Sequence, residues 1–373
     1  MKGRKTLAAL LALVMAGTAF AAAGCSTDTG SAASTAASEA GSTAASAAQT
    51  ENTAMPDKTV ILTSTWIGYA PLHLAVEKGF FEQEGLPNVE LSVIESSGDR
   101  NAAIKANQGQ ILTQTQDTEV MTMASGIDLK EVLPLCDSNG GDGLVCKNEY
   151  NSLEDLKGKT VALDTTGGAS LYWFNTILEE AGMTMDDFDV RNMTAGDAGA
   201  AFVGGQVDAA VTWEPWLSNA RKTDFGKVLY SSKDYPGVIT DALAVRSDYA
   251  EQYPEAVKAL IRGWFDAVAY AAENPDDANP IMAESMGMST EDFEAQLQNI
   301  RYYDEDYANE YLCGGKMQEN VQKASDLWVK IGLMDENVDA SQIVDPSYLE
   351  AVVEADGGVS STTSESSAAA SAA

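Results

Sequence analysis

The chain has 373 residues, which exceeds the usual size of a single domain and predicts two lobes for its folded part. Its 56 aspartates and glutamates outnumber its 23 lysines and arginines, and the formal net charge is −33. Such a surface repels phosphates. We therefore exclude a nucleic acid as the partner and expect the acidity to serve solubility.

Residues 1–24 are typical of a bacterial export signal. Three of the first five residues are basic, an apolar run from Leu7 to Met15 follows, and small residues continue up to Cys25. The apolar run is too short to span a bilayer comfortably. A cysteine directly after small residues resembles the lipobox of bacterial lipoproteins, although Ala22 stands where such boxes usually carry leucine. We predict lipidation of Cys25 and anchoring to the outer face of the cytoplasmic membrane; cleavage after an alanine is the alternative.

Two terminal stretches offer almost nothing to bury. Residues 25–56 are mainly serine, threonine, alanine, glycine and acidic residues, and residues 356–373 have a similar composition. Such segments cannot offset their own ordering entropy. We predict a disordered tether and a disordered tail.

The other cysteines give no sign of a metal site. Cys136, Cys146 and Cys313 are an odd set without metal-ligand spacing, so we expect no metal and no cofactor. Cys136 and Cys146 lie in strand-like segments. They can either form a disulfide in an oxidising compartment or remain buried thiols.

Between the two terminal stretches, short β-rich runs alternate with helical patterns. The predicted strands cover residues 59–65, 89–95, 111–115, 131–136, 143–147, 160–163 and 209–212. The predicted helices cover residues 71–84, 101–108, 118–125, 170–181 and 198–204, and later 254–273, 290–298 and 321–331. This alternation predicts α/β lobes with parallel or mixed sheets and helices on both faces.

Several sequence blocks, in their order and spacing, resemble one family of binding proteins. The blocks cover residues 66–72, 75–81, 84–86, 142–145, 155–162, 200–210 and 211–216. They are similar to the family that binds nitrate, sulfonates, taurine and thiamine precursors. The resemblance covers about residues 59–246 closely and the helical remainder loosely.

The resemblance implies a type II periplasmic-binding-protein fold, in which two α/β lobes joined by two crossover strands hold a ligand in the cleft between them. Lobe 1 would comprise residues 57–143 plus 241–355, and lobe 2 residues 144–240. It also implies a function: a monomer that captures a small polar nitrogen- or sulfur-containing molecule of the taurine or sulfonate, amine or pyrimidine type. The partners would be an ABC importer permease and its ATPase.

We expect the ligand site in the loops that follow strands, because open α/β sheets bind ligands beyond the carboxyl ends of their strands. The candidate ligand-binding residues are Trp66, Gly68, Tyr69, Gln116, Asp117, Asn139, Thr166, Gly167, Ser170, Trp213, Glu214, Trp216 and Asp241. Trp66 would form an aromatic wall or pack in the core. The glycine-rich loop at Thr166 would offer backbone amides to an anionic group, or would simply begin a helix.

The block Trp213-Glu214-Pro215-Trp216 is the first candidate. A carboxylate between two indoles suits an ammonium group or a ring N–H donor. The alternative is a pair of packed indoles around a helix-capping Glu214. Because the candidate loops contain no arginine, we expect an amine-bearing, heterocyclic or zwitterionic ligand rather than a pure anion.

Two other functions compete with solute import. The opening region also resembles a fungal synthase of the thiamine pyrimidine, and the only histidine, His73, lies there. The chain lacks the clustered cysteines of that enzyme and shows no nucleophile with an adjacent base, so we expect no enzyme activity. The second alternative is a tethered ligand sensor, which the sequence does not separate from an importer component.

Overall fold

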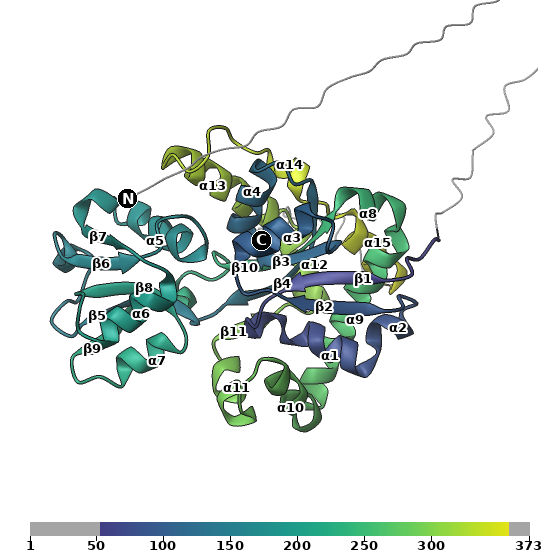
Figure 1. Cartoon of the computed structure of the whole chain (residues 1–373), viewed down its shortest axis with the longest axis horizontal. Helices are drawn as coiled ribbons and strands as arrows, with labels where there is room; N and C mark the ends of the chain where they lie inside the picture. The colour runs from purple at the N-terminus through teal and green to yellow at the C-terminus, as the bar shows by residue number, and fades with distance from the viewer. Residues whose placement is uncertain (1–52, 358–373) are drawn as a thin grey trace, which may run out of the picture. The chain divides into compact units, whose positions relative to one another are not determined.

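The computed structural model describes residues 53–357, which contain two mixed β-sheets with flanking helices (Figure 1). The predicted export signal, the predicted lipidation site at Cys25 and nearly all of the predicted tether and tail lie outside these residues. Within residues 53–357, no helix combines the length and the apolar character needed to cross a membrane.

The first sheet has the strand order β11-β4-β10-β3-β1-β2. Its strands are β1 (Thr59–Thr63), β2 (Val89–Val93), β3 (Ile111–Thr115), β4 (Leu129–Ser138), β10 (Thr240–Arg246) and β11 (Ile300–Tyr302). Strand β1 runs parallel to β2 and β3, whereas β10 runs antiparallel to β3 and β4. The carboxyl ends of β1, β2 and β3 therefore meet at one edge of the sheet.

The second sheet has the order β7-β6-β8-β5-β9. Its strands are β5 (Asp142–Lys147), β6 (Thr160–Leu163), β7 (Asp189–Asn192), β8 (Ala209–Trp213) and β9 (Gly226–Ser231). The chain passes from the first sheet to the second between β4 and β5 and returns between β9 and β10. The α/β class predicted from the sequence is confirmed, while the lobe boundaries stay a prediction.

Helices flank both sheets (Figure 1). Around the second sheet lie α5 (Ala169–Glu180), α6 (Ala195–Val203) and α7 (Trp216–Arg221). Along the chain, four helices precede the strands of the second sheet: α1 (Ala70–Lys78), α2 (Phe80–Gln83), α3 (Ser97–Lys105) and α4 (Gln116–Ala124). After it come α8 (Ser247–Gln252), α9 (Pro254–Glu273), α10 (Pro275–Ser285), α11 (Thr290–Leu297), α12 (Glu305–Leu312), α13 (Lys316–Lys330), α14 (Ala340–Ile343) and α15 (Ser347–Ala355).

The helix predicted over residues 71–84 is two helices. Gly79 has φ 71°, in the left-handed region, where it ends α1 and begins α2. Glycine adopts this conformation without the steric cost that a Cβ atom adds, so the chain turns at this point.

The cysteines that could have formed a disulfide are free. Cys136 lies in β4 of the first sheet and Cys146 in β5 of the second, and both thiols are buried. Of the two alternatives, the structure has the buried thiols.

Candidate functional site

A cavity of about 500 Å³ is lined by residues that follow strands of both sheets. From the first sheet and its helices come Ser64, Thr65, Trp66, Ile67, Tyr69, Glu95, Ser97, Arg100, Gln114, Thr115, Thr118, Ile239, Asp241, Met286, Met288 and Gln296. From the second come Asp142, Ala169, Trp213, Glu214 and Pro215. The antiparallel register that pairs Asp142 with Trp213 brings the start of β5 beside the end of β8. Strand-end loops of both sheets thus meet at this cavity.

Some of the candidate residues line this cavity and others do not. Those in the lining are Trp66, Tyr69, Trp213, Glu214 and Asp241. Those outside it are Gly68, Gln116, Asp117, Asn139, Thr166, Gly167, Ser170 and Trp216. Their part in ligand binding stays a prediction.

Several residues outside the lining have structural partners of their own. The Gln116 Oε1 atom accepts from Asn320 Nδ2 at 2.8 Å, and Asn139 N donates to Asn299 O at 2.8 Å. Both the backbone N–H and the hydroxyl of Thr166 donate to Asp164, at 2.9 and 2.6 Å. These contacts engage Gln116 Oε1, the Asn139 backbone N–H and the Thr166 donors without a ligand, whereas Gln116 Nε2 is buried and has no partner among residues 53–357.

Glu214 has the geometry of the helix-capping alternative. Its carboxylate accepts from Ser218 N at 2.9 Å and Ser218 Oγ at 3.0 Å in α7, and from Arg221 Nη1 at 3.1 Å. Only 7% of Glu214 is exposed. Because both oxygens have partners and Arg221 supplies the countercharge, the carboxylate needs no ammonium group from a ligand.

The two indoles of that block differ in exposure. Trp213 is 40% exposed and lines the cavity. Trp216 packs against α6, where a Cβ atom on Gly199 would lie 2.4 Å from Trp216 Cγ. Trp213 is therefore the indole that is free to contact a ligand.

Asp241 connects the returning strand β10 to the loop after β1. It accepts hydrogen bonds from Trp66 Nε1 at 3.1 Å and from the Tyr69 hydroxyl. Burial raises the pKa of Asp241, and the hydrogen bond from Tyr69 opposes that rise. With these donors in place, Asp241 holds the Trp66 indole as one wall of the cavity.

Arg100 is a cavity residue that the sequence analysis missed. It lies on α3, is 6% exposed, and donates from Nη1 to Ile94 O at 2.7 Å and Glu95 O at 3.0 Å. Among residues 53–357 no carboxylate forms an ion pair with it. Burial raises the pKa of Asp241 and the charge of Arg100 helps to lower it, but a buried guanidinium without a direct ion pair is expensive, so it favours an anionic group in the cavity. A search limited to strand-following loops cannot find a residue on a helix face.

The remaining carboxyl groups of the lining differ in their environments. Glu95 accepts from the Thr65 hydroxyl at 2.9 Å. Burial raises the pKa of Asp142 to about 7, and repulsion from Asp241 and Glu214 adds to the rise. Asp142 is therefore partly protonated at neutral pH and can then donate a hydrogen bond.

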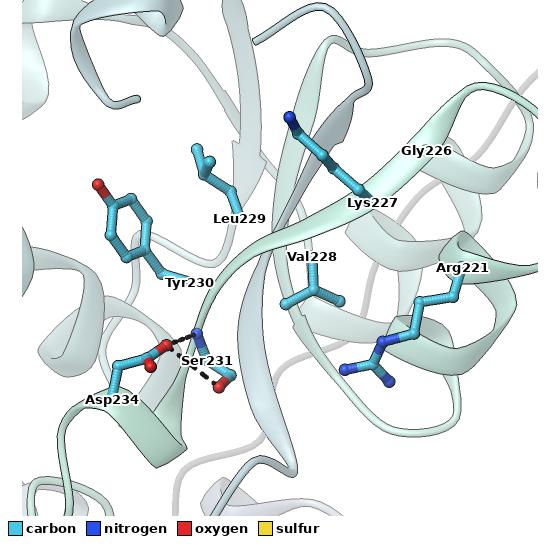
Figure 2. Close-up of a pocket in the computed structure, with 8 residues that line it drawn as sticks. All are labelled: Arg221, Gly226, Lys227, Val228, Leu229, Tyr230, Ser231 and Asp234. Atoms are coloured by element: carbon cyan, nitrogen blue, oxygen red, sulfur yellow. Dashed lines mark hydrogen bonds between the residues drawn. The ribbon is translucent and has the colours of Figure 1, made fainter. Parts of the chain in front are cut away.

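A second hollow, of about 520 Å³, lies along the edge strand β9 (Figure 2). Its charged groups are already engaged: Arg221 pairs with Glu214, and Lys227 Nζ donates to Asn151 Oδ1 at 2.7 Å. Ser231 donates to Asp234 from its backbone N–H at 2.9 Å and from its hydroxyl at 3.3 Å. The charged groups of this hollow already have partners within the described chain and offer a ligand little to bind. We therefore place the candidate site in the first cavity.

Residues 66–278 match the model of a protein family described as NMT1/THI5 like. The chain belongs to this family. The resemblance predicted from the sequence blocks is thereby confirmed.

Several relatives and solved structures that this family member is similar to are binding proteins. A Bacillus subtilis (strain 168) protein named for binding aliphatic sulfonates is 24% identical over 292 residues, which cover 76% of this chain and 85% of the relative. The taurine-binding periplasmic protein of Escherichia coli (strain K12) is 26% identical over 209 residues, or 55% of this chain and 64% of the relative. The solved aliphatic sulphonate binding protein SsuA from Escherichia coli has a TM-score of 0.67 and 18% identity, over 85% of this chain and 98% of that chain.

A more distant solved structure with this fold is an enzyme. The desulfurization enzyme DszB has a TM-score of 0.55 and 16% identity, over 80% of this chain and 100% of that chain. The fold alone therefore does not separate binding proteins from enzymes.

Proposed function

We propose that this chain is an extracytoplasmic solute-binding protein, which captures a small nitrogen- or sulfur-containing organic molecule and delivers it to an ABC importer permease and its ATPase. The observation that carries the proposal is Arg100, a buried guanidinium without an ion pair in a cavity lined by strand-end residues of both sheets. The names of the relatives support the same function. Anchoring through a lipidated Cys25, action as a monomer and the absence of enzyme activity belong to this proposal.

The cavity supports an organic ligand with an acidic or otherwise electron-rich head group. Arg100 would hold that group, because a guanidinium donates strong charge-assisted hydrogen bonds to sulfonate or carboxylate oxygens. Trp66, Trp213 and Met288 offer apolar surface to the rest of the molecule. The absence of arginine from the candidate loops led us to disfavour anions, and Arg100 on α3 removes that reason.

The arrangement of side chains around the cavity gives little support to a catalytic function. Cys136 is the thiol beside the cavity wall, with its Sγ 3.5 Å from Asp241 Oδ2. Burial and the neighbouring carboxyl groups raise the pKa of Cys136 well above its usual value, whereas a nucleophilic cysteine needs a low pKa. His73 lies on α1, outside the cavity lining.

Ligand binding can be tested by thermal unfolding of the purified protein with taurine, propane-1-sulfonate, nitrate, pyrimidines and amino acids. A compound that binds only the folded state raises the melting temperature. We expect Arg100→Met to weaken binding of the responding compound by roughly tenfold or more, since charge-assisted hydrogen bonds contribute about 1.5–3 kcal/mol.

Arg191→Met is the matched control, because Arg191 is exposed on β7 and pairs with Asp189. It should bind the compound like the wild type. A protein whose melting temperature responds to none of the compounds, or one that binds equally well with Met at position 100, contradicts the proposal.

A further inference from the structure

Two buried side chains in the cavity wall each have a polar atom without a hydrogen-bond partner. Gln114, near the end of β3, is 2% exposed, and its Oε1 has no partner among residues 53–357. The Nε atom of Arg100 also has none within the described chain. Unmet buried donors and acceptors destabilise a protein, so two of them in one cavity wall suggest a group that the chain itself does not supply.

The amide of Gln114 is held in one orientation. Its Nε2 donates to Thr122 Oγ1 at 2.8 Å and to Asn101 Oδ1 at 3.4 Å. The Thr122 hydroxyl has one proton, which it donates to Thr118 O at 3.1 Å, so towards Gln114 it can only accept. The network therefore keeps Oε1 as a buried acceptor, and no donor of residues 53–357 satisfies it.

Arg100 and Gln114 lie on neighbouring elements of the same wall. Asn101, which accepts from Gln114, directly follows Arg100 in α3. The guanidinium is held in place by its hydrogen bonds to Ile94 O and Glu95 O. The wall thus presents a fixed cationic donor and, near it, a fixed neutral acceptor.

We propose that Gln114 is a specificity-determining residue, which accepts a hydrogen bond from an N–H group of the ligand while Arg100 holds an anionic group of the same molecule. This proposal rests on the proposed solute-binding function and narrows the ligand to small zwitterions of the aminosulfonate or amino-acid kind. A ligand with acceptors alone places its lone pairs against Gln114 Oε1, and a site built to hydrogen-bond an N–H group rejects such analogues strongly.

The charge of the cavity gives independent support. Besides Arg100, the lining contains the carboxyl groups of Glu95, Asp142, Glu214 and Asp241, of which Glu214 is paired with Arg221. A pure anion meets more negative than positive groups there. A zwitterion has an anionic group for Arg100 and a cationic group for the carboxyl groups, so both kinds of charge in the lining attract it.

The test compares two sulfonates of the same size by calorimetric titration of the full chain. Taurine and propane-1-sulfonate have equal numbers of non-hydrogen atoms and differ by an ammonium group in place of a methyl group. We expect the wild type to bind taurine at least about tenfold more tightly. Gln114→Met removes the acceptor and should lower this ratio about tenfold, whereas Gln114→Glu keeps an acceptor and adds a negative charge, so it should preserve or raise the ratio.

Two further variants separate a change in ligand specificity from a general loss of stability. Thr122→Val removes the hydroxyl that orients the amide, so the amide can turn over and the ratio should fall. Gln110→Met is the control, because Gln110 lies before β3 and accepts from Val60 N at 2.8 Å, outside the cavity lining. It should keep the wild-type ratio even if it lowers stability.

The outcomes separate this inference from the proposed function. Equal affinity of the wild type for both sulfonates, or an unchanged ratio in Gln114→Met, overturns the role of Gln114 and leaves solute binding intact. If another compound of the thermal panel binds instead, the presence or absence of an N–H donor in that compound decides the question in the same way. If none of the compounds binds, the solute-binding proposal itself fails.

Discussion

At the scale of single residues, two fully buried carboxyl groups stand out. Glu119 lies on α4 and Glu131 on β4, and their carboxyl groups form a hydrogen bond with each other; within residues 53–357 their oxygens have no further hydrogen-bond partner. Burial raises the pKa of Glu131 to about 8; the hydrogen bond from Glu119 opposes this rise, and the negative charge of Asp117 adds to it. Burial and the neighbouring Glu131 raise the pKa of Glu119 well above its usual value.

The raised pKa of Glu131 predicts how stability depends on pH. The ordinary pKa is 4.5 and the folded value about 8, so the folded state binds more protons than the unfolded state between these values. The free energy of unfolding therefore falls as pH rises through this window. Urea unfolding at pH 5 and pH 8 should show that Glu131→Gln reduces this loss by about 1 kcal/mol or more.

A matched control for this prediction is Glu90→Gln. Glu90 is exposed and pairs with Lys58, so its removal should leave the pH dependence as in the wild type. If Glu131→Gln and the wild type lose the same stability between the two pH values, the carboxyl of Glu131 is not protonated in the folded state.

The candidate site shows which residues a sequence can nominate. Trp66 lies in the loop after β1 and Trp213 is the last residue of β8, so a rule about strand ends places both correctly at the cavity. Arg100 and Gln114 escape the rule because one lies on a helix and the other within a strand. Nor does the sequence say that Glu214 is paired with Arg221, because that pairing depends on how α7 leaves β8.

At the scale of elements, the packing of α6 against α7 depends on one glycine. A Cβ atom on Gly199 would lie 2.5 Å from Trp216 Cβ and 2.7 Å from Thr212 Oγ1, both closer than side chains allow. Gly199 lies within α6, where alanine would otherwise favour the helix by about 1 kcal/mol. The clash outweighs that gain, because overpacking a core costs about 1–3 kcal/mol.

We therefore expect Gly199→Ala to lower the free energy of unfolding by roughly 1–2 kcal/mol in urea titrations. Gly196→Ala is the control in the same helix. A Cβ atom there would lie 3.9 Å from Trp216 Nε1, an ordinary contact, so this change should be neutral or stabilising. Equal effects of the two substitutions would mean that Trp216 moves aside without cost.

The predicted elements succeed where burial and β-branched residues coincide. Ile111–Thr115 and Thr160–Leu163 begin and end as predicted, since each is a mostly buried run between polar segments. Strand β7 was not predicted because its residues Asp189–Asn192 are mostly polar and exposed at the sheet edge. Strand β11 has three residues, too few to show a period.

At the scale of the whole molecule, the sequence predicted the fold class and the family, because the order of many short blocks carries more information than any one of them. It does not predict which helices touch across the two sheets. Tyr172 on α5 donates to Asn320 Oδ1 on α13 at 3.0 Å, and Asn320 in turn donates to Gln116. Lys330 on α13 also pairs with Glu179 on α5.

These contacts lead to a prediction about closure. If they belong to the arrangement that a ligand stabilises, their loss shifts the population towards an open form and weakens binding by the same free energy. Tyr172→Phe keeps the ring, which lies 5.9 Å from that of Trp328, and removes only the hydroxyl. We expect a two- to tenfold loss of ligand affinity, since one neutral hydrogen bond contributes about 0.5–1.5 kcal/mol.

Small-angle scattering of Tyr172→Phe without ligand should show a larger radius of gyration than that of the wild type. Tyr230→Phe on β9, outside the cavity lining, is the control and should change neither quantity. Unchanged affinity and scattering in Tyr172→Phe would show that α5 and α13 stay together in every state.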